Sequence, residues 1–80
     1  MIVSVEISYY PLTGDFITPV NAFIQQLAWE GIAVETGKMS TIITGEWETV
    51  MKLLTKSMGD LMEKYPSVFT MKISNSCQIK

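Results

Sequence analysis

Apolar and polar side chains alternate in two long stretches of this chain, one near each end. From Ile2 to Tyr10, and again from Ser67 to Ser74, apolar residues recur at every second position. A period of two, with β-branched and aromatic residues, is typical of a strand that buries one face. Two shorter stretches, Ile32 to Thr36 and Thr41 to Thr44, predict two further strands. Because only a short connection with Gly37 separates them, they should form an antiparallel hairpin.

Helical spacing of apolar residues fills the two segments between these strands. The first helix should begin at Thr18-Pro19, with the Thr18 hydroxyl as N-cap, and Gly31 should close it as the C′ residue. Gly45-Glu46 leads into the second helix, which Pro66 ends. The apolar stripe of that helix predicts eight side chains turned toward the core: Trp47, Val50, Met51, Leu54, Met58, Leu61, Met62 and Tyr65.

The predicted order is strand, helix, strand, strand, helix, strand. Two right-handed crossovers around a central hairpin give an α+β, ferredoxin-like βαββαβ sandwich, with a four-stranded antiparallel sheet and both helices on one face. At 80 residues, the whole chain (1–80) is expected to be one domain. The first and third strands would be central in the sheet. The helices would cover one set of side chains: Val3, Val5, Ile7, Tyr9, Phe69, Met71 and Ile73.

The other face of the predicted sheet has no helix over it. It would carry small hydroxyls, a few charges and a tyrosine: Ser4, Glu6, Ser8, Tyr10, Glu35, Thr70 and Lys72. A face exposed to water would carry more charge, so we expect this face, or the unpaired edge strands, to pack against another copy. The composition of 48% hydrophobic and 18% charged residues favours the same interpretation, because one small core leaves apolar surface over.

The charged and sulfur-containing residues exclude several function classes. The chain has six lysines, eight acidic residues and a net charge of −2, with no arginine and no histidine. Without arginine, nucleic-acid binding is disfavoured. Without histidine, the commonest metal ligand and general base are missing. The lone Cys77, in a polar segment from Asn75 to Lys80, offers no disulfide or Cys-x-x-Cys motif. We therefore expect no metal, no cofactor and no enzymatic activity.

The sequence also shows no pattern typical of a targeting signal. The first residues read directly as a strand, without the basic and apolar regions of a signal peptide. No apolar run approaches the ~20 residues that span a bilayer. The expectation is a cytoplasmic protein without a membrane partner.

Two segments carry a pattern shared with a known family. The residues are Tyr9-Tyr10-Pro11-Leu12 and Glu35-x-Gly37-x-Met39-Ser40-Thr41-x-Ile43-x-Gly45-Glu46-x-x-x-Val50. The order and spacing of these residues, over most of the chain, resemble those of the small thiamine-binding proteins, the YkoF-like group. The resemblance implies a ferredoxin-like fold and association through the sheets, as tandem repeats or homo-oligomers. It also implies non-catalytic binding of thiamine or its hydroxymethylpyrimidine part.

Two candidate ligand residues are carboxylates. Glu6, in the middle of the first strand, could accept hydrogen bonds from an aminopyrimidine in a charge-assisted pair. It could equally form an ion pair with Lys72 on the neighbouring strand. Glu35 is either a second carboxylate near the cationic thiazolium or a charge that protects an edge strand from aggregation.

The remaining candidates carry hydroxyls. Ser40 and Thr41 could donate to and accept from a heteroaromatic edge, or they could serve only the hairpin. Tyr10 could offer an aromatic face to the ligand or pack in an interface. Ser8 shares the open face with Glu6. The predicted ligand-binding set is therefore Glu6, Ser8, Tyr10, Glu35, Ser40 and Thr41.

Two functions of different classes stay open. The first is binding of thiamine or hydroxymethylpyrimidine in a polar pocket at the sheet or subunit interface. The second is a structural or regulatory module whose open face only forms an oligomer interface. An ACT-like amino-acid sensor shares the fold but lacks support in the sequence. The expected partners are the small ligand and the chain itself, as a homodimer or homotetramer.

Overall fold

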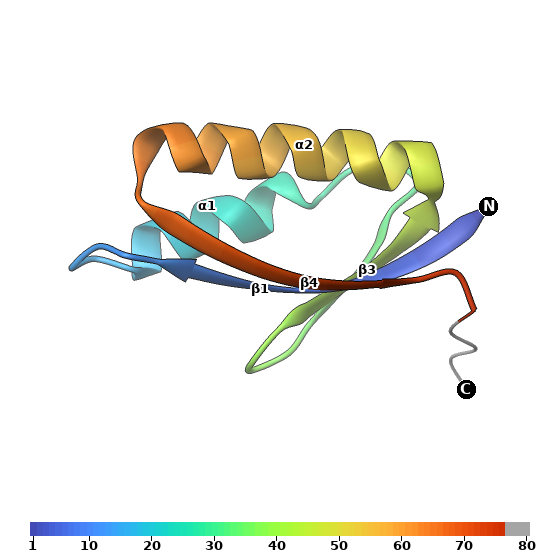
Figure 1. Ribbon diagram of the computed structural model, residues 1–80, viewed down its shortest axis with the longest axis horizontal. Helices are drawn as coiled ribbons and strands as arrows, with labels where there is room; N and C mark the ends of the chain where they lie inside the picture. The colour runs from blue at the N-terminus through green and yellow to red at the C-terminus, as the bar shows by residue number, and fades with distance from the viewer. Residues whose placement is uncertain (77–80) are drawn as a thin grey trace.

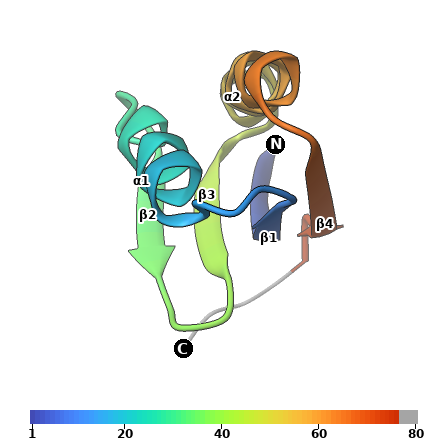
Figure 2. The same ribbon diagram turned by 90° about the vertical axis from the view of Figure 1, so that its left-hand side faces the viewer.

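The fold is the predicted βαββαβ sandwich. The computed structural model describes residues 1–76. All neighbouring strands are antiparallel, in the sheet order β2-β3-β1-β4. Both helices lie on one side of the sheet (Figures 1 and 2). The elements are β1 (Ile2–Pro11), α1 (Ile17–Gln26), β2 (Ala33–Thr36), β3 (Thr41–Glu46), α2 (Trp47–Lys64) and β4 (Ser67–Ser74).

The core lies between the helices and the central strands. Val3, Val5 and Ile7 of β1 are buried there, as predicted. At one end three aromatic rings meet. Tyr9 and Phe69 stack with their centroids 4.4 Å apart, and Phe23 of α1 meets both rings edge-on at 5.5 and 5.6 Å. Such offset and edge-on pairs add about 0.5–1.5 kcal/mol beyond their area burial. This cluster fixes α1 to β1 and β4.

The prediction of the covered set is wrong at the far end of β4. Met71 and Ile73 are paired with Ile7 and Val5 and so belong to the helix side of the sheet. They are nevertheless 42% and 45% exposed. The reason is the placement of the helices, because α2 packs on β3 and β1, and β4 lies at the side of the sheet away from α1 (Figure 2).

The apolar stripe of α2 is turned relative to the prediction. Its buried residues are Val50, Leu53, Leu54, Ser57 and Leu61. Met51, Met58 and Tyr65 are partly buried against the core. Met62, predicted to be core, is 53% exposed, and Trp47 is also exposed. Leu53 and Ser57, which the predicted stripe left out, are fully buried, and the Ser57 hydroxyl has no hydrogen-bond partner among the described residues.

The start of α1 differs from the prediction, because Asp15 rather than Thr18 caps it. Asp15 Oδ1 accepts from the backbone amides of Ile17 at 3.1 Å and Thr18 at 3.3 Å. Asp15 Oδ2 accepts from the Thr18 hydroxyl at 2.8 Å. The carboxylate thus satisfies amides that a helix start leaves unpaired. The helix ends at Gln26, so Gly31 is not its C′ residue. Gly31 has φ +85° and serves the loop before β2.

This cap predicts a pH-dependent stability. The Thr18 hydroxyl and amide hold the pKa of the Asp15 carboxyl below its ordinary value of 3.8. Because the pKa is lower in the folded state, the stabilisation is present above 3.8 and is lost as the pH falls through the folded pKa. Asp15→Ala should therefore destabilise the fold at neutral pH, and the difference from wild type should shrink below 3.8.

Urea denaturation of both proteins at a series of pH values measures this difference. Thr18→Val is the control, because it removes the hydroxyl that lowers the pKa most and keeps the amide bonds to Asp15. It should show a weaker pH dependence than wild type. A wild-type-to-Asp15→Ala difference that stays constant down to low pH would contradict this account of the cap.

The other predicted boundaries shift by one or two residues. β1 includes Pro11, β2 begins at Ala33 rather than Ile32, and β3 continues through Gly45 to Glu46. Gly45 therefore does not open α2. Among the described residues, no helix combines the length and apolar character needed to cross a membrane. Cys77 and most of the predicted polar segment lie outside the described residues.

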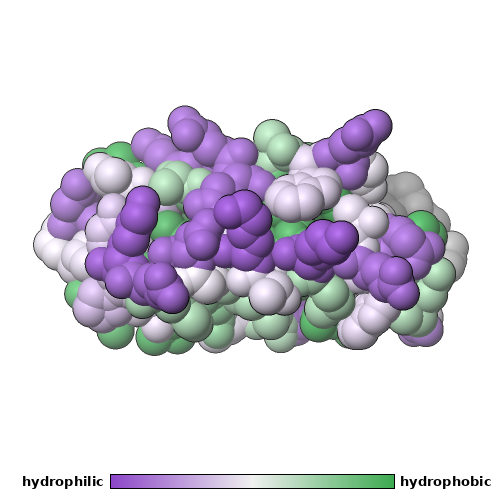
Figure 3. Space-filling view, turned by 90° about the horizontal axis from the view of Figure 1, so that it is seen from above, coloured by the Kyte–Doolittle hydropathy of each residue, from purple (hydrophilic) through white to green (hydrophobic). Residues whose placement is uncertain are grey.

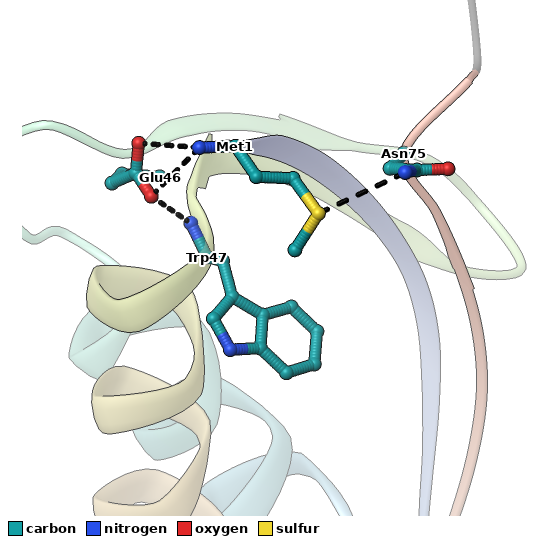
Figure 4. Close-up of polar contacts among 4 residues, drawn as sticks. All are labelled: Met1, Glu46, Trp47 and Asn75. Atoms are coloured by element: carbon teal, nitrogen blue, oxygen red, sulfur yellow. Dashed lines mark hydrogen bonds and ion pairs between the residues drawn. The ribbon is translucent and has the colours of Figure 1, made fainter.

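Met1, which directly precedes β1, is joined to the β3–α2 junction (Figure 4). The Met1 α-amino group donates to both carboxylate oxygens of Glu46, at 3.2 and 3.0 Å. The Trp47 amide donates to Glu46 Oε1 at 3.0 Å and to the Met1 carbonyl at 2.9 Å. The Asn75 side-chain amide reaches Met1 Sδ at 3.7 Å. These contacts set the position at which α2 starts over the sheet.

Candidate functional site

Four side chains form one row across the face of the sheet that no helix covers, here called the open face. The strand registers place Glu35, Ile42, Glu6 and Lys72 side by side across all four strands. Glu35 is thus on the open face, as predicted, with Ile42 between it and Glu6. Two carboxylates and one lysine in this row leave it with a net negative charge.

Glu6 makes both kinds of contact considered from the sequence. Its Oε2 accepts from the Ser40 hydroxyl at 3.0 Å. Its Oε1 lies 4.0 Å from Lys72 Nζ, and the Lys72 side chain is almost fully exposed. An exposed pair at this distance is weak in water, worth about 0–1 kcal/mol. The Glu6 carboxylate is half exposed, so it keeps acceptor capacity that the protein does not use.

A pocket of about 350 Å³ opens beside Glu6 on the open face, and we call it the open-face pocket. It brings together four predicted ligand residues, Glu6, Ser8, Tyr10 and Ser40. Thr70 stands opposite Ser8 in the register and adds a hydroxyl. The rest of the lining is Met39, Met71 and Lys72. The walls therefore combine one carboxylate, hydroxyls, an aromatic ring and one cation.

A second pocket, of about 380 Å³, lies on the helix side and is here called the helix-side pocket. Thr41 lines it, is only 6% exposed, and pairs with Ile7 and Thr36. Thr41 is therefore separated from Glu6 by the sheet. Apolar side chains of α1 form the opposite wall: Val20, Phe23 and Ile24.

The β2–β3 hairpin and the neighbouring end of β1 form the boundary between the two pockets. Ser8, Tyr10, Met39 and Ser40 line both of them. The Ser8 hydroxyl donates to the Met39 carbonyl at 3.1 Å, and the Gly37 amide donates to the Ser40 carbonyl at 2.9 Å. The first bond attaches the hairpin to β1, and the second closes its turn. The hydroxyls thus serve the hairpin, as considered from the sequence, and Ser40 also contacts Glu6.

The structure does not bring all six predicted residues together. Glu35 lines neither pocket, and Thr41 lines only the helix-side one. Thr70 was placed on the open face from the sequence but was not included in the site. The period of two from Ser67 to Ser74, which put Thr70 on the same face as Ser8, was the available signal. Met39 is part of the pattern shared with the family, but its place in the pocket depends on the hairpin turn. No group of three or more acidic or sulfur ligands within residues 1–76 is arranged to hold a metal ion.

Comparisons with known proteins agree with this fold. The family described as "Thiamine-binding protein" matches residues 5–76 of the chain. Among curated proteins, none matches. A Streptococcus pneumoniae protein of known structure superposes with a TM-score of 0.84 at 18% identity, covering 92% of this chain and 86% of that one.

Two further solved structures are similar. One is a Thermotoga maritima protein named for a proposed role in thiamine biosynthesis or salvage, with TM-score 0.84, 22% identity and coverage of 95% and 85% of the two chains. The other is a hypothetical protein from Methanocaldococcus jannascii, with TM-score 0.82, 21% identity and coverage of 99% and 84%. At these identities the structural likeness establishes the fold. The family match, which spans nearly the whole chain, shows that the protein belongs to the thiamine-binding protein family.

Proposed function

We propose that this protein binds thiamine, or its hydroxymethylpyrimidine part, in the open-face pocket and catalyses no reaction. The observation that carries the proposal is the Glu6 carboxylate, which is held in place by Ser40 and is half exposed to the pocket. Membership of the family supports the class of ligand. The pocket supplies the matching chemistry.

The aminopyrimidine ring presents an amine and ring nitrogens along one edge. A carboxylate accepts from the amine and from a protonated ring nitrogen in a charge-assisted pair, which is stronger than a neutral hydrogen bond. The hydroxyls of Ser8 and Thr70 can donate or accept on either side. Tyr10, exposed at the edge of the pocket, offers an aromatic face to the cationic thiazolium.

Glu35 and Thr41 have weaker roles in this proposal. Glu35 adds negative potential to the open face from one strand beyond Ile42. Thr41 places its hydroxyl in the helix-side pocket. That pocket lies on the helix side of the sheet, away from Glu6.

The second candidate function is an interaction module without a small ligand. The observation that favours it is the number of large hydrophobic side chains exposed on the described residues, among them Met39, Met62, Met71 and Ile73. Contiguous exposed apolar patches mark interaction sites in small proteins, and Met71 and Ile73 are next to each other on one face of β4. In this alternative the open-face pocket is only a gap that a neighbouring copy fills.

Calorimetry with thiamine and with hydroxymethylpyrimidine distinguishes the two functions. Glu6→Gln should weaken binding by roughly 10- to 100-fold, because a hydrogen bond to a charged group contributes about 1.5–3 kcal/mol. Glu35→Gln is the matched control, since it makes the same change on the same face outside both pockets. It should weaken binding only slightly, through the loss of a distant charge.

Thr41→Val tests the helix-side pocket in the same way and should leave the affinity nearly unchanged. The absence of heat with both ligands, for wild-type protein shown to be folded, would reject the binding function and favour the interaction module. Equal losses for Glu6→Gln and Glu35→Gln would place the ligand outside the open-face pocket.

A further inference from the structure

The central strand β1 is longer than its pairing with β3. β1 continues to Pro11, but its ladder with β3 ends at the pair of Ile7 and Thr41. On its other side β1 stays paired with β4 up to Pro11. Beyond Ile7 the β2–β3 hairpin turns away from the end of β1 (Figures 1 and 2). The space that opens between Tyr9 and the hairpin tip, residues 37–40, is here called the edge gap.

Hydrogen bonds next to the two ends of β1 show to which side each residue turns its main-chain groups. The Trp47 amide donates to the Met1 carbonyl at 2.9 Å, so Met1 faces β3. The Leu12 amide donates to the Pro66 carbonyl at 2.8 Å, so Leu12 faces β4. In an antiparallel sheet, successive residues of a strand turn their N–H and C=O to opposite sides. The odd-numbered residues of β1 therefore face β3, and the even-numbered ones face β4.

Tyr9 accordingly directs both its N–H and its C=O into the edge gap. Within residues 1–76 no hydrogen bond joins its main chain to the hairpin tip. The carbonyl of Pro11 points to the same side, and proline has no N–H to add. Main-chain polar groups in folded proteins are nearly always paired with protein or with water. The edge gap thus offers one donor with an acceptor beside it, both free for a ligand.

The edge gap is also the place where the two pockets meet. Tyr9 lines the helix-side pocket, and the residues that flank the gap, Ser8, Tyr10, Met39 and Ser40, line both pockets. The next ladder pair after Ile7 would join Tyr9 to Met39. Instead, the Ser8 hydroxyl donates to the Met39 carbonyl at 3.1 Å. A side chain therefore holds the hairpin here, and the main chain of Tyr9 stays open to both pockets.

The surface above the sheet has a different character. Seen from the helix side, hydrophilic side chains run along the molecule over α2 (Figure 3). This is the pattern of a solvated helix face, and the N–H and C=O groups inside a helix are paired with each other. Free main-chain donors and acceptors next to a pocket are therefore a feature of the end of β1, not of the helices.

We propose that the Tyr9 N–H and C=O are main-chain ligand groups, and that they bind a flat ring carrying an amine beside an unprotonated ring nitrogen. The N–H would donate to the ring nitrogen, and the amine would donate to the C=O. The inference rests on the proposed function, since the aminopyrimidine of thiamine has such an edge. An amine carries two hydrogens, so it can donate to Tyr9 and to the Glu6 carboxylate at once.

A small ring fits this edge better than a peptide strand. A strand that adds to a sheet needs a run of alternating donors and acceptors. The free edge of β1 supplies only one N–H, because Pro11 follows Tyr9 on the same side. The hairpin tip, fixed by Ser8, closes the other side of the gap. One donor and its neighbouring acceptor match the edge of a single heteroaromatic ring.

Hydrogen exchange followed by NMR tests whether Tyr9 is free and whether a ligand occupies it. In the free protein the Tyr9 amide should exchange faster than the Ile7 amide, which is paired in the ladder with Thr41. Addition of hydroxymethylpyrimidine should slow the exchange of Tyr9. Val34 is the control amide, because Glu35 pairs with Ile42 and Val34 therefore points outward at the other edge of the sheet. Its exchange should not change.

Calorimetry with a main-chain variant tests the contribution of the N–H. Replacing Tyr9 by its α-hydroxy acid turns the amide into an ester, which removes the donor and keeps the side chain. The affinity for hydroxymethylpyrimidine should fall about 3- to 10-fold, the usual net effect of one neutral hydrogen bond. The same replacement at Val34 is the matched control, since it removes an outward N–H away from both pockets. It should leave the affinity unchanged.

The possible failures are distinguishable. If wild type binds neither thiamine nor hydroxymethylpyrimidine, the proposed function and this inference fall together. If wild type binds but the Tyr9 ester binds equally well, and the Tyr9 amide gains no protection, only the role of Tyr9 is overturned. A Tyr9 amide that exchanges as slowly as that of Ile7 in the free protein would also overturn it, because its N–H would already be paired.

Discussion

Leu53→Ala should lower the free energy of unfolding by about 2–5 kcal/mol. Leu53 is 0% exposed on the inner face of α2, and removing a buried leucine side chain costs both its transfer free energy and the cavity it leaves. A chain of 80 residues has a total stability of only about 4–12 kcal/mol, at 0.05–0.15 kcal/mol per residue. This single change should therefore remove a large fraction of the stability. Urea denaturation with the midpoint and slope fitted together measures the loss.

Met62→Ala on the same helix is the control. Met62 is 53% exposed, so its truncation should change the unfolding free energy by only about 0.5 kcal/mol. The sequence pattern predicts that Met62 is buried and Leu53 is not, whereas in the structure Leu53 is buried and Met62 is exposed. The variant with the greater loss of stability therefore shows which of the two side chains packs in the core. A greater loss for Met62→Ala than for Leu53→Ala would contradict the observed orientation of α2.

The pattern of α2 identifies the helix but not its rotation. The apolar residues of α2 spread over a wide arc of the helix surface. Leu53 lies on one side of the central apolar stripe, and Met51, Met58 and Met62 lie on the other. Successive residues of a helix are turned by about 100° around its axis. The buried residues of α2 therefore centre on a direction roughly 60° away from the centre of the predicted core residues. Which part of a wide arc faces the core depends on how the helix lies over β1 and β3, and this is a tertiary contact that the period of the sequence does not encode.

The element order and the sheet topology were predictable because they depend on local periods and on general rules of connection. The period of two in β1 and β4, the hairpin at Gly37 and the handedness of crossovers leave few alternatives. Element ends were less predictable. Thr18 and Asp15 both have side chains that cap helices, and only the contacts of the folded chain show that Asp15 takes this role.

The candidate site was predictable in part for the same reason. Glu6, Ser8 and Tyr10 alternate along one strand, so their common face follows from the period of two. Ser40 joins them because the β1–β3 register and its bond to Glu6 bring it there. The face of Thr41 was not determined by the sequence, since Thr41 to Thr44 carries two adjacent isoleucines and allows either orientation. The register with Ile7 places Thr41 on the helix side.

Gly45→Ala should destabilise the fold by about 1–3 kcal/mol, the usual cost of overpacking a core. Gly45 is buried in β3, where a Cβ would lie 2.8 Å from Ile32 Cδ1 and 3.0 Å from the Gly31 carbonyl oxygen. The isoleucine tip can turn aside, but the carbonyl belongs to the backbone of the loop before β2. Because Gly45 does not have a positive φ, backbone strain does not contribute, and the cost comes from the close approach alone.

Gly59→Ala makes the same chemical change with the opposite expected sign. A Cβ at Gly59 would meet nothing within 4 Å, and alanine in a helix interior is favoured over glycine by about 1 kcal/mol. Thermal unfolding of the two variants should therefore move the midpoint down for Gly45→Ala and up for Gly59→Ala. A Gly45→Ala variant as stable as wild type would mean that the loop before β2 moves away from β3. A destabilised Gly59→Ala variant would indicate that another molecule packs closely against that side of α2.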